Sequence, residues 1–120
     1  MIHEELTASV IAVCYEVINE LGTGFLESVY EKALMLALHQ KGIAAKAHAP
    51  LKVKFRNEIV GEFFVDILVE DRLIVELKAV RSLLPEHQAQ LINYLKATGI
   101  DVGLLVNFGN AKLEVRRLHR

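Results

Sequence analysis

The sequence predicts an α/β protein, and three features of its hydrophobic pattern predict that class. Up to about residue 41, apolar residues recur at intervals of three and four, the period of helices that face a core. From residue 51 to residue 78 the pattern changes to the short apolar runs typical of strands. Another helical segment and a further apolar strand follow. The expected order is two helices, three strands, a helix and two strands.

The two N-terminal helices are expected over Glu4–Leu21 and about Leu26–Lys41. The first ends at a glycine-rich turn over residues 22–24, and the second ends at Gly42, which suits the left-handed conformation that closes many helices. The single cysteine, Cys14, lies on the apolar stripe of the first helix and is expected to be an inert core thiol.

The middle of the chain is expected to form strands over Leu51–Arg56, Ile59–Val69 and Leu73–Lys78, with a hairpin turn at residues 57–58. Pro85 suits the first turn of a helix, so the third helix is expected to run through Glu86–Thr98. The run VGLLVN is apolar on both faces, as in a central strand, and the alternating Lys112–Leu118 predicts an edge strand.

Length and composition favour one domain over residues 1–120. A chain of 120 residues can bury a hydrophobic core without disulfides. Its 52% hydrophobic content is high for that length, which favours a homodimer that hides apolar surface. With one cysteine, no basic N-terminal region and no apolar run of about 18 residues, the expectation is a cytoplasmic protein without a membrane segment.

Three charged residues interrupt the apolar strands: Asp66, Glu76 and Lys78. Because strand side chains alternate, Glu76 and Lys78 share one face, about 7 Å apart. Asp66 joins that face only if residues 70–72 form a three-residue turn or an equivalent bulge, which sets it about 5 Å from Glu76 between Cβ atoms. A two-residue turn would put Asp66 on the other face.

Two carboxylates so placed repel each other unless a cation lies between them, and Mg²⁺ or Mn²⁺ suits such oxygen ligands. Lys78 could then hold or help to deprotonate an attacking water. The alternative is a surface ion pair between Glu76 and Lys78, with Asp66 solvated. A third acid, Glu27, lies on the same helical stripe as Tyr30, although a glutamate in a first turn also simply suits the helix dipole.

Four segments resemble the GxxExxY protein family: GFLESVY, FVDILVEDRLIVELKAV, PEHQAQL and GLLVNFG. That family is similar to the PD-(D/E)XK nuclease superfamily. The resemblance implies a restriction-endonuclease-like α-β-β-β-α-β core, with a mixed central sheet flanked by helices. It also implies catalysis by Asp66, Glu76 and Lys78, and Mg²⁺, with Mn²⁺ as substitute. The implied metal ligands are Glu27, Asp66, Glu76 and the main-chain carbonyl of Leu77.

Gln90 and Tyr94 are spaced as in the Q-x-x-x-Y motif of exonuclease-like superfamily members, and His87 lies one turn earlier. Together with Tyr30, these residues are candidates for substrate binding. The alternatives are a buried polar contact for Gln90, a core position for Tyr94 and an ordinary surface position at a helix N-terminus for His87.

A row of cations, Lys52, Lys54 and Arg56, alternates with apolar residues along the first strand. Such a row could follow a phosphate backbone, or it could be an ordinary solvated strand face. The net charge of −1 argues against coating nucleic acid by bulk charge.

Two functions follow as hypotheses. One is a Mg²⁺-dependent nuclease acting on nucleic acid, DNA before RNA. The other is a non-catalytic module that retains the fold and binds nucleic acid or a protein.

Overall fold

The computed structural model describes residues 2–120, and its elements follow in the predicted order. The three helices are α1 (Glu4–Leu21), α2 (Glu27–Gln40) and α3 (Pro85–Thr98). The five strands are β1 (Ala45–Phe55), β2 (Glu58–Val69), β3 (Leu73–Lys78), β4 (Val102–Asn107) and β5 (Glu114–His119). The predicted α/β class is confirmed. No helix in this range is both long and apolar enough to cross a membrane.

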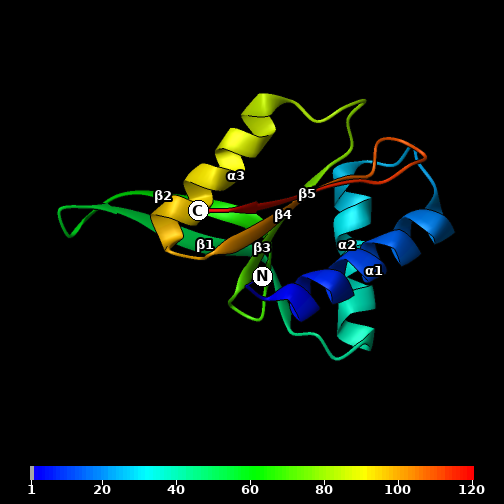
Figure 1. The fold of residues 1–120 in the computed structure, drawn as a ribbon, viewed down its shortest axis with the longest axis horizontal. Helices are drawn as coiled ribbons and strands as arrows, with labels where there is room; N and C mark the ends of the chain where they lie inside the picture. Colours follow the sequence, from blue (N-terminus) through cyan, green and yellow to red (C-terminus); the bar gives the residue numbers. More distant parts are fainter. Residues whose placement is uncertain (1) are drawn as a thin grey trace.

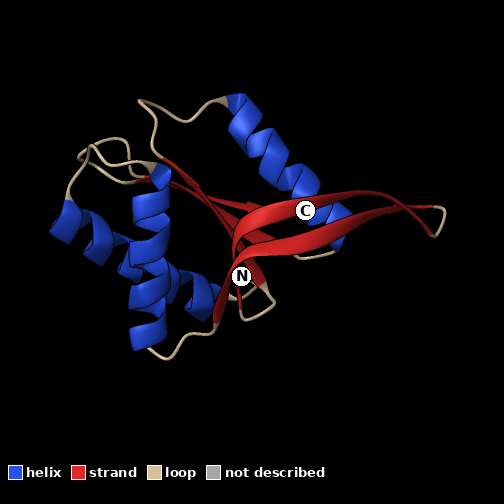
Figure 2. Cartoon of the chain, turned by 180° about the vertical axis from the view of Figure 1, so that it is seen from behind, coloured by secondary structure: helices blue, strands red, loops and turns tan. Residues whose placement is uncertain are grey.

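The strands form one mixed sheet in the order β1-β2-β3-β4-β5 (Figure 1). Only β3 and β4 are parallel, because α3 carries the chain back between them; the other neighbours are antiparallel. Seen from behind, the β1–β2 hairpin reaches out beyond the rest of the sheet (Figure 2). The expected α-β-β-β-α-β core is therefore present, with α2 as its first helix.

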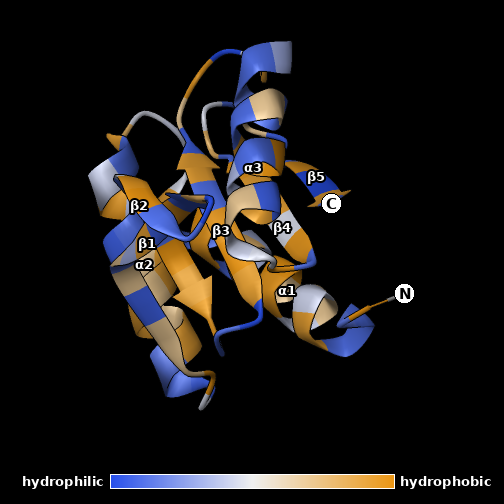
Figure 3. Ribbon diagram, turned by 90° about the vertical axis from the view of Figure 1, so that its left-hand side faces the viewer, coloured by the Kyte–Doolittle hydropathy of each residue, from blue (hydrophilic) through white to orange (hydrophobic). Residues whose placement is uncertain are grey.

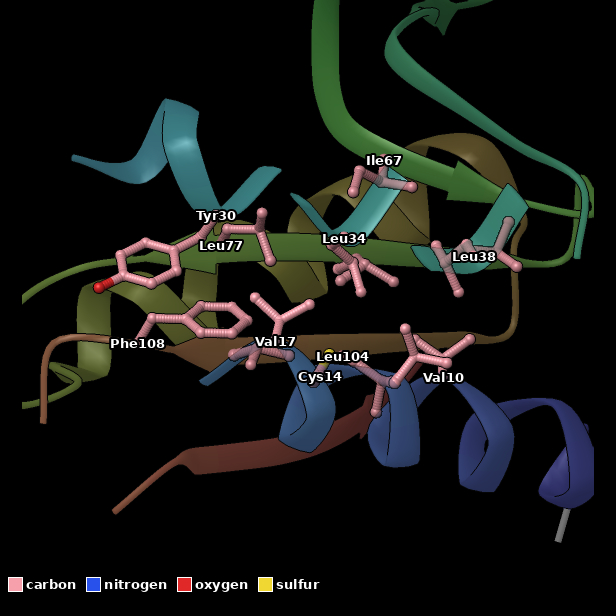
Figure 4. Packing of buried hydrophobic residues seen from close by; sticks show 14 of the residues in the cluster. Val10, Cys14, Val17, Tyr30, Leu34, Leu38, Ile67, Leu77, Leu104 and Phe108 are labelled. Carbon is pink, nitrogen blue, oxygen red and sulfur yellow. The ribbon is translucent and has the colours of Figure 1, made fainter. Parts of the chain in front are cut away.

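Helices cover both faces of the sheet. Hydrophobic residues are concentrated along β3 and β4, which lie in the middle of the sheet (Figure 3). One core cluster joins α1 and α2 to one sheet face, and a second joins α3 to the opposite face. Cys14 lies fully buried in the first cluster (Figure 4), which confirms its expected core position, and burial raises its thiol pKa to about 12.

The first hairpin differs from the prediction in two ways. β1 begins at Ala45 rather than Leu51, because its first half combines small alanines with a proline, Pro50, and these residue types are uncommon in strands. The turn consists of Arg56 and Asn57, both in the left-handed conformation, and Phe55 pairs with Glu58. A two-residue turn with two positive φ angles matches the twist of the flanking strands.

Candidate active site

The turn between β2 and β3 has the three-residue form that the site requires. Val69 pairs with Leu73, and the amide of Arg72 donates to the carbonyl of Val69 at 3.0 Å. Glu70 and Asp71 take the left-handed conformation, with φ of 49° and 55°. The predicted register is thus confirmed.

The ladder between β2 and β3 stops after Ile67 pairs with Val75, and carboxylates take over the pairing. The amide of Asp66 donates to Oε1 of Glu76 at 3.1 Å, and the amide of Leu77 donates to Oδ2 of Asp66 at 2.7 Å. Each carboxylate therefore accepts a hydrogen bond from a main-chain amide that would otherwise lack a partner on the opposite strand. We call the point where β2 and β3 stop pairing the fork. The carboxylates of Asp66 and Glu76 lie opposite each other at the fork.

Glu76 is the more deeply buried of the two acids, with 6% of its surface exposed. Burial, and next the negative charge of Asp66, raise its pKa to about 8, while Lys78 on the same face acts in the opposite direction. The pKa of Tyr94 is also raised, by burial and then by Glu76 and Asp66. The fork thus holds two close carboxylates whose repulsion a cation would relieve.

This burial predicts that stability depends on pH. Because the folded-state pKa of Glu76 is raised from 4.5 to about 8, the native state holds a proton that the unfolded state releases in that interval. Without metal, this group's contribution is complete below about pH 4.5 and is lost as the pH rises to about 8. We expect a loss of roughly 2–4 kcal/mol in urea unfolding, and a flatter profile for Glu76→Gln. Identical slopes for the two proteins would contradict this assignment.

A hollow of about 520 Å³ opens beside the fork, between α2 and the strands. It is lined by Phe25, Leu26, Glu27, Ser28, Glu31, His48, Asp66 and Ala79. Glu27 is the first residue of α2 and is exposed, so its carboxylate shares this hollow with Asp66. Lys78 is half-buried on the same strand as Glu76.

The motif that contains Glu27 is built around a tyrosine clamp. The hydroxyl of Tyr30 donates to the carbonyl of Gly22 at 2.7 Å and accepts from the amide of Phe25 at 3.3 Å. Gly24 has a φ of 103°, which favours glycine. Tyr30 is fully buried and stacks on Phe108 at 4.8 Å between ring centroids (Figure 4). The expectation that Tyr30 binds substrate is therefore wrong, because its ring and hydroxyl are already occupied.

The structure brings Asp66 beside Glu76 at the fork and beside Glu27 in the hollow, but it forms no closed cage of ligands. Over residues 2–120, no three His, Cys, Asp or Glu side chains are arranged to hold an ion between them. Asp66 and Glu76 each accept a main-chain hydrogen bond with one oxygen, and a hydrogen bond between the two side chains also raises the pKa of Glu76. Once Glu76 releases its proton, this all-oxygen pair would be doubly negative and would suit Mg²⁺, which commonly takes one or two carboxylates and completes its shell with water and phosphate.

The three candidate substrate-binding residues on α3 differ in their contacts and exposure. Tyr94 stacks on Phe63 of β2 at 4.1 Å between centroids, and the effect of the carboxylates on its pKa places it near the fork. Gln90 is exposed and is not the buried polar contact of the alternative interpretation. His87 caps the helix: its Nδ1 accepts from the amide of Leu84 at 3.0 Å.

The row of cations is only partly formed. Lys52 and Lys54 are exposed on β1. Arg56 lies in the hairpin turn instead of the strand, and its guanidinium sits over the ring of Phe55 at 4.8 Å. The prediction of three cations on one strand face is therefore wrong for Arg56, since the strand ends before it.

Two residues of the hollow were missed in the sequence, Glu31 and His48. Glu31 follows Glu27 by one turn of α2, a spacing that could have drawn attention to it. His48 lies in the part of β1 that the strand prediction omitted.

Comparisons with known proteins agree with this fold. A family model described as the PD-(D/E)XK nuclease superfamily matches residues 4–118. The fold is similar to the crystal structure of SSO0001, with a TM-score of 0.63 and 17% sequence identity; the alignment covers 78% of this chain and 49% of that one. The chain thus spans about half the length of that structure. A search of curated proteins found no match.

Proposed function

Since this chain belongs to the PD-(D/E)XK nuclease superfamily, we propose that it is a Mg²⁺-dependent nuclease that hydrolyses phosphodiester bonds of nucleic acid. The observation that carries the proposal is the fork, where the Glu76 carboxylate accepts from the amide of Asp66 and the Asp66 carboxylate accepts from the amide of Leu77. Lys78 lies on the same face as Glu76. A surface ion pair of Glu76 and Lys78 does not explain a glutamate that is 6% exposed.

In the proposed reaction, water attacks phosphorus, a P–O bond breaks, and the leaving oxygen ends with a proton. Asp66, Glu76, the carbonyl of Leu77 and, from α2, Glu27 would hold the cation. When bound, a divalent cation supplies charge that polarises the phosphate and makes water more acidic. Glu76 must release its proton to act as a ligand, because metals bind the carboxylate form. Lys78 would orient the attacking water and stabilise its negative charge as its proton leaves.

The substrate we propose is nucleic acid, DNA before RNA, recognised through its backbone. Lys52 and Lys54 are exposed on the hairpin and would contact phosphates, with Arg56 at the tip. Tyr94 and Gln90, on the helix beside the fork, would orient the strand being cut, and Nε2 of His87 would be open to a phosphate. A homodimer with one hairpin per subunit would extend this surface.

The proposal is tested by incubating end-labelled single- and double-stranded DNA and RNA with the protein and Mg²⁺ or Mn²⁺. We expect cleavage that EDTA abolishes, and a loss of about a hundredfold or more in Lys78→Ala, because that change removes the group that handles the attacking water. Lys41→Ala is the matched control, since Lys41 pairs with Glu16 on the helices and lies outside the hollow. Equal rates in the two variants would contradict the role of Lys78.

One observation favours the alternative of a non-catalytic binding module. Large apolar side chains are exposed along the β1–β2 hairpin: Phe55, Ile59, Val60 and Phe64. Exposed apolar patches are typical of binding surfaces. Binding of nucleic acid without cleavage of any substrate, under either metal, would favour this module over the nuclease.

A further inference from the structure

The ladder between β1 and β2 has a gap directly beside Asp66. Ala47 pairs with Ile67 and Ala49 pairs with Val65, but His48 and Asp66, between these pairs, do not pair. His48 has a φ of 53°, in the left-handed region that residues other than glycine seldom adopt. Such outliers in a strand are a reason to look for a function.

His48 reaches from the gap to α2. Its Nε2 lies 2.7 Å from Oε1 of Glu31. Because a carboxylate accepts, Nε2 carries the hydrogen, and Nδ1 is left as the ring nitrogen for a ligand. The side chain of Glu31 is 13% exposed and that of His48 is 69% exposed. Glu31 is thus the anchored partner, and His48 presents its ring to solvent and to the hollow.

The hollow needs a positive group if an anion is to enter it. Three carboxylates line it, from Glu27, Glu31 and Asp66. Burial first, and then Asp66 and Glu27, raise the pKa of Glu31, whereas His48 and Lys32 lower it. Among the described residues that line the hollow, His48 is the one side chain able to carry positive charge.

We propose that His48, oriented by Glu31, contacts a phosphate oxygen of the nucleic acid held beside Asp66. The inference rests on the proposed function and adds a substrate-contacting residue to the same site. Glu31 is a positioning residue: it fixes the ring through Nε2, so that the N–H of Nδ1 in the imidazolium form can donate to the phosphate oxygen. With the cation at the fork and His48 on the neighbouring strand beside Asp66, the phosphodiester would contact both.

The test compares binding and cleavage in the same variants. His48→Asn removes the imidazole but keeps a residue that tolerates the left-handed backbone. With Ca²⁺ in place of Mg²⁺, fluorescence anisotropy of a labelled DNA oligonucleotide should show binding about tenfold weaker, the loss expected for one charge-assisted hydrogen bond. With Mg²⁺, KM should rise by a similar factor and kcat should change little.

Three further variants sharpen the test. His48→Arg should restore most of the affinity, because it returns a cationic donor. Glu31→Ala should weaken binding, and its effect should add less than fully to that of His48→Asn, as for two residues acting through one contact. His39→Gln is the control: His39 is exposed at the end of α2 and lies outside the hollow.

The outcomes separate this inference from the proposed function. If wild type cleaves but His48→Asn binds and cleaves like wild type, with only its melting temperature changed, then the Glu31–His48 pair is merely structural and the inference fails alone. If wild type binds without cleaving, the nuclease proposal fails, and anisotropy still decides the role of His48. If wild type neither binds nor cleaves, both fail.

Discussion

Asp66→Asn should eliminate cleavage and leave the fold intact. The substitution removes one of the two charges at the fork, so the cation loses a ligand and activity should fall by at least about a hundredfold, the scale seen when one preorganised electrostatic group is removed. The fold should persist because an asparagine Oδ1 can still accept from the amide of Leu77, which Asp66 now does at 2.7 Å. Cleavage of labelled DNA and circular dichroism measure the two effects.

A thermal shift serves as the control for Asp66→Asn. Mn²⁺ should raise the melting temperature of wild type, because a ligand that binds only the native state stabilises it, and should not raise that of the variant. Without metal, the variant should be at least as stable as wild type near pH 8, since Asp66 is among the causes that raise the pKa of Glu76. Cleavage at the wild-type rate would contradict the proposed site.

Gly109→Ala should destabilise the protein by about 3 kcal/mol or more, roughly 10 °C in melting temperature. A Cβ at Gly109 would lie 2.0 Å from the carbonyl oxygen of Val80 and 2.5 Å from its nitrogen. These are backbone atoms, so no side-chain rotation can relieve the clash. Val80 is also held by Asn107, whose Oδ1 accepts from the Val80 amide and whose Nδ2 donates to its carbonyl, both at 2.9 Å.

The matched control is Gly61→Ala, because a Cβ at Gly61 would meet no atom within 4 Å. Its stability should stay within about 1 kcal/mol of wild type. Since Val80 follows the end of β3 by two residues, Gly109→Ala should also disturb Lys78 and reduce cleavage among the molecules that remain folded. Equal melting temperatures for the two alanine variants would contradict the prediction, because they would mean that the backbone at Val80 can move away from the added Cβ without a loss of stability.

The order of elements and the register at the fork were predictable because each depends on local pattern. The hydrophobic periods of helices and strands are clear in the sequences of α1, α2 and β3. A shared site for Asp66 and Glu76 is possible only with a three-residue turn between β2 and β3. That reasoning required only alternation along a strand and the distance between opposed side chains.

The remaining features depend on partners that are remote in sequence. The clamp of Tyr30 uses main-chain atoms of the turn before α2, and the buried amide of Asn107 joins two loops. His48 could not be identified, because its left-handed backbone and its contact with Glu31 exist only once β1 lies against α2. Hydrophobic spacing carries no signal for such contacts.

The positions of the carboxylates at the fork depend on an irregularity of the sheet, the missing pairs between β2 and β3. If β2 and β3 paired through their main chains past Ile67 and Val75, a carbonyl of β2 would accept from the amide of Leu77, and Asp66 would lose that hydrogen bond. A regular ladder would thus leave the Asp66 carboxylate without this fixed position. The unpaired parts of β2 and β3 therefore hold the Asp66 carboxylate in place. A substitution that restored main-chain pairing there would be expected to reduce the proposed activity.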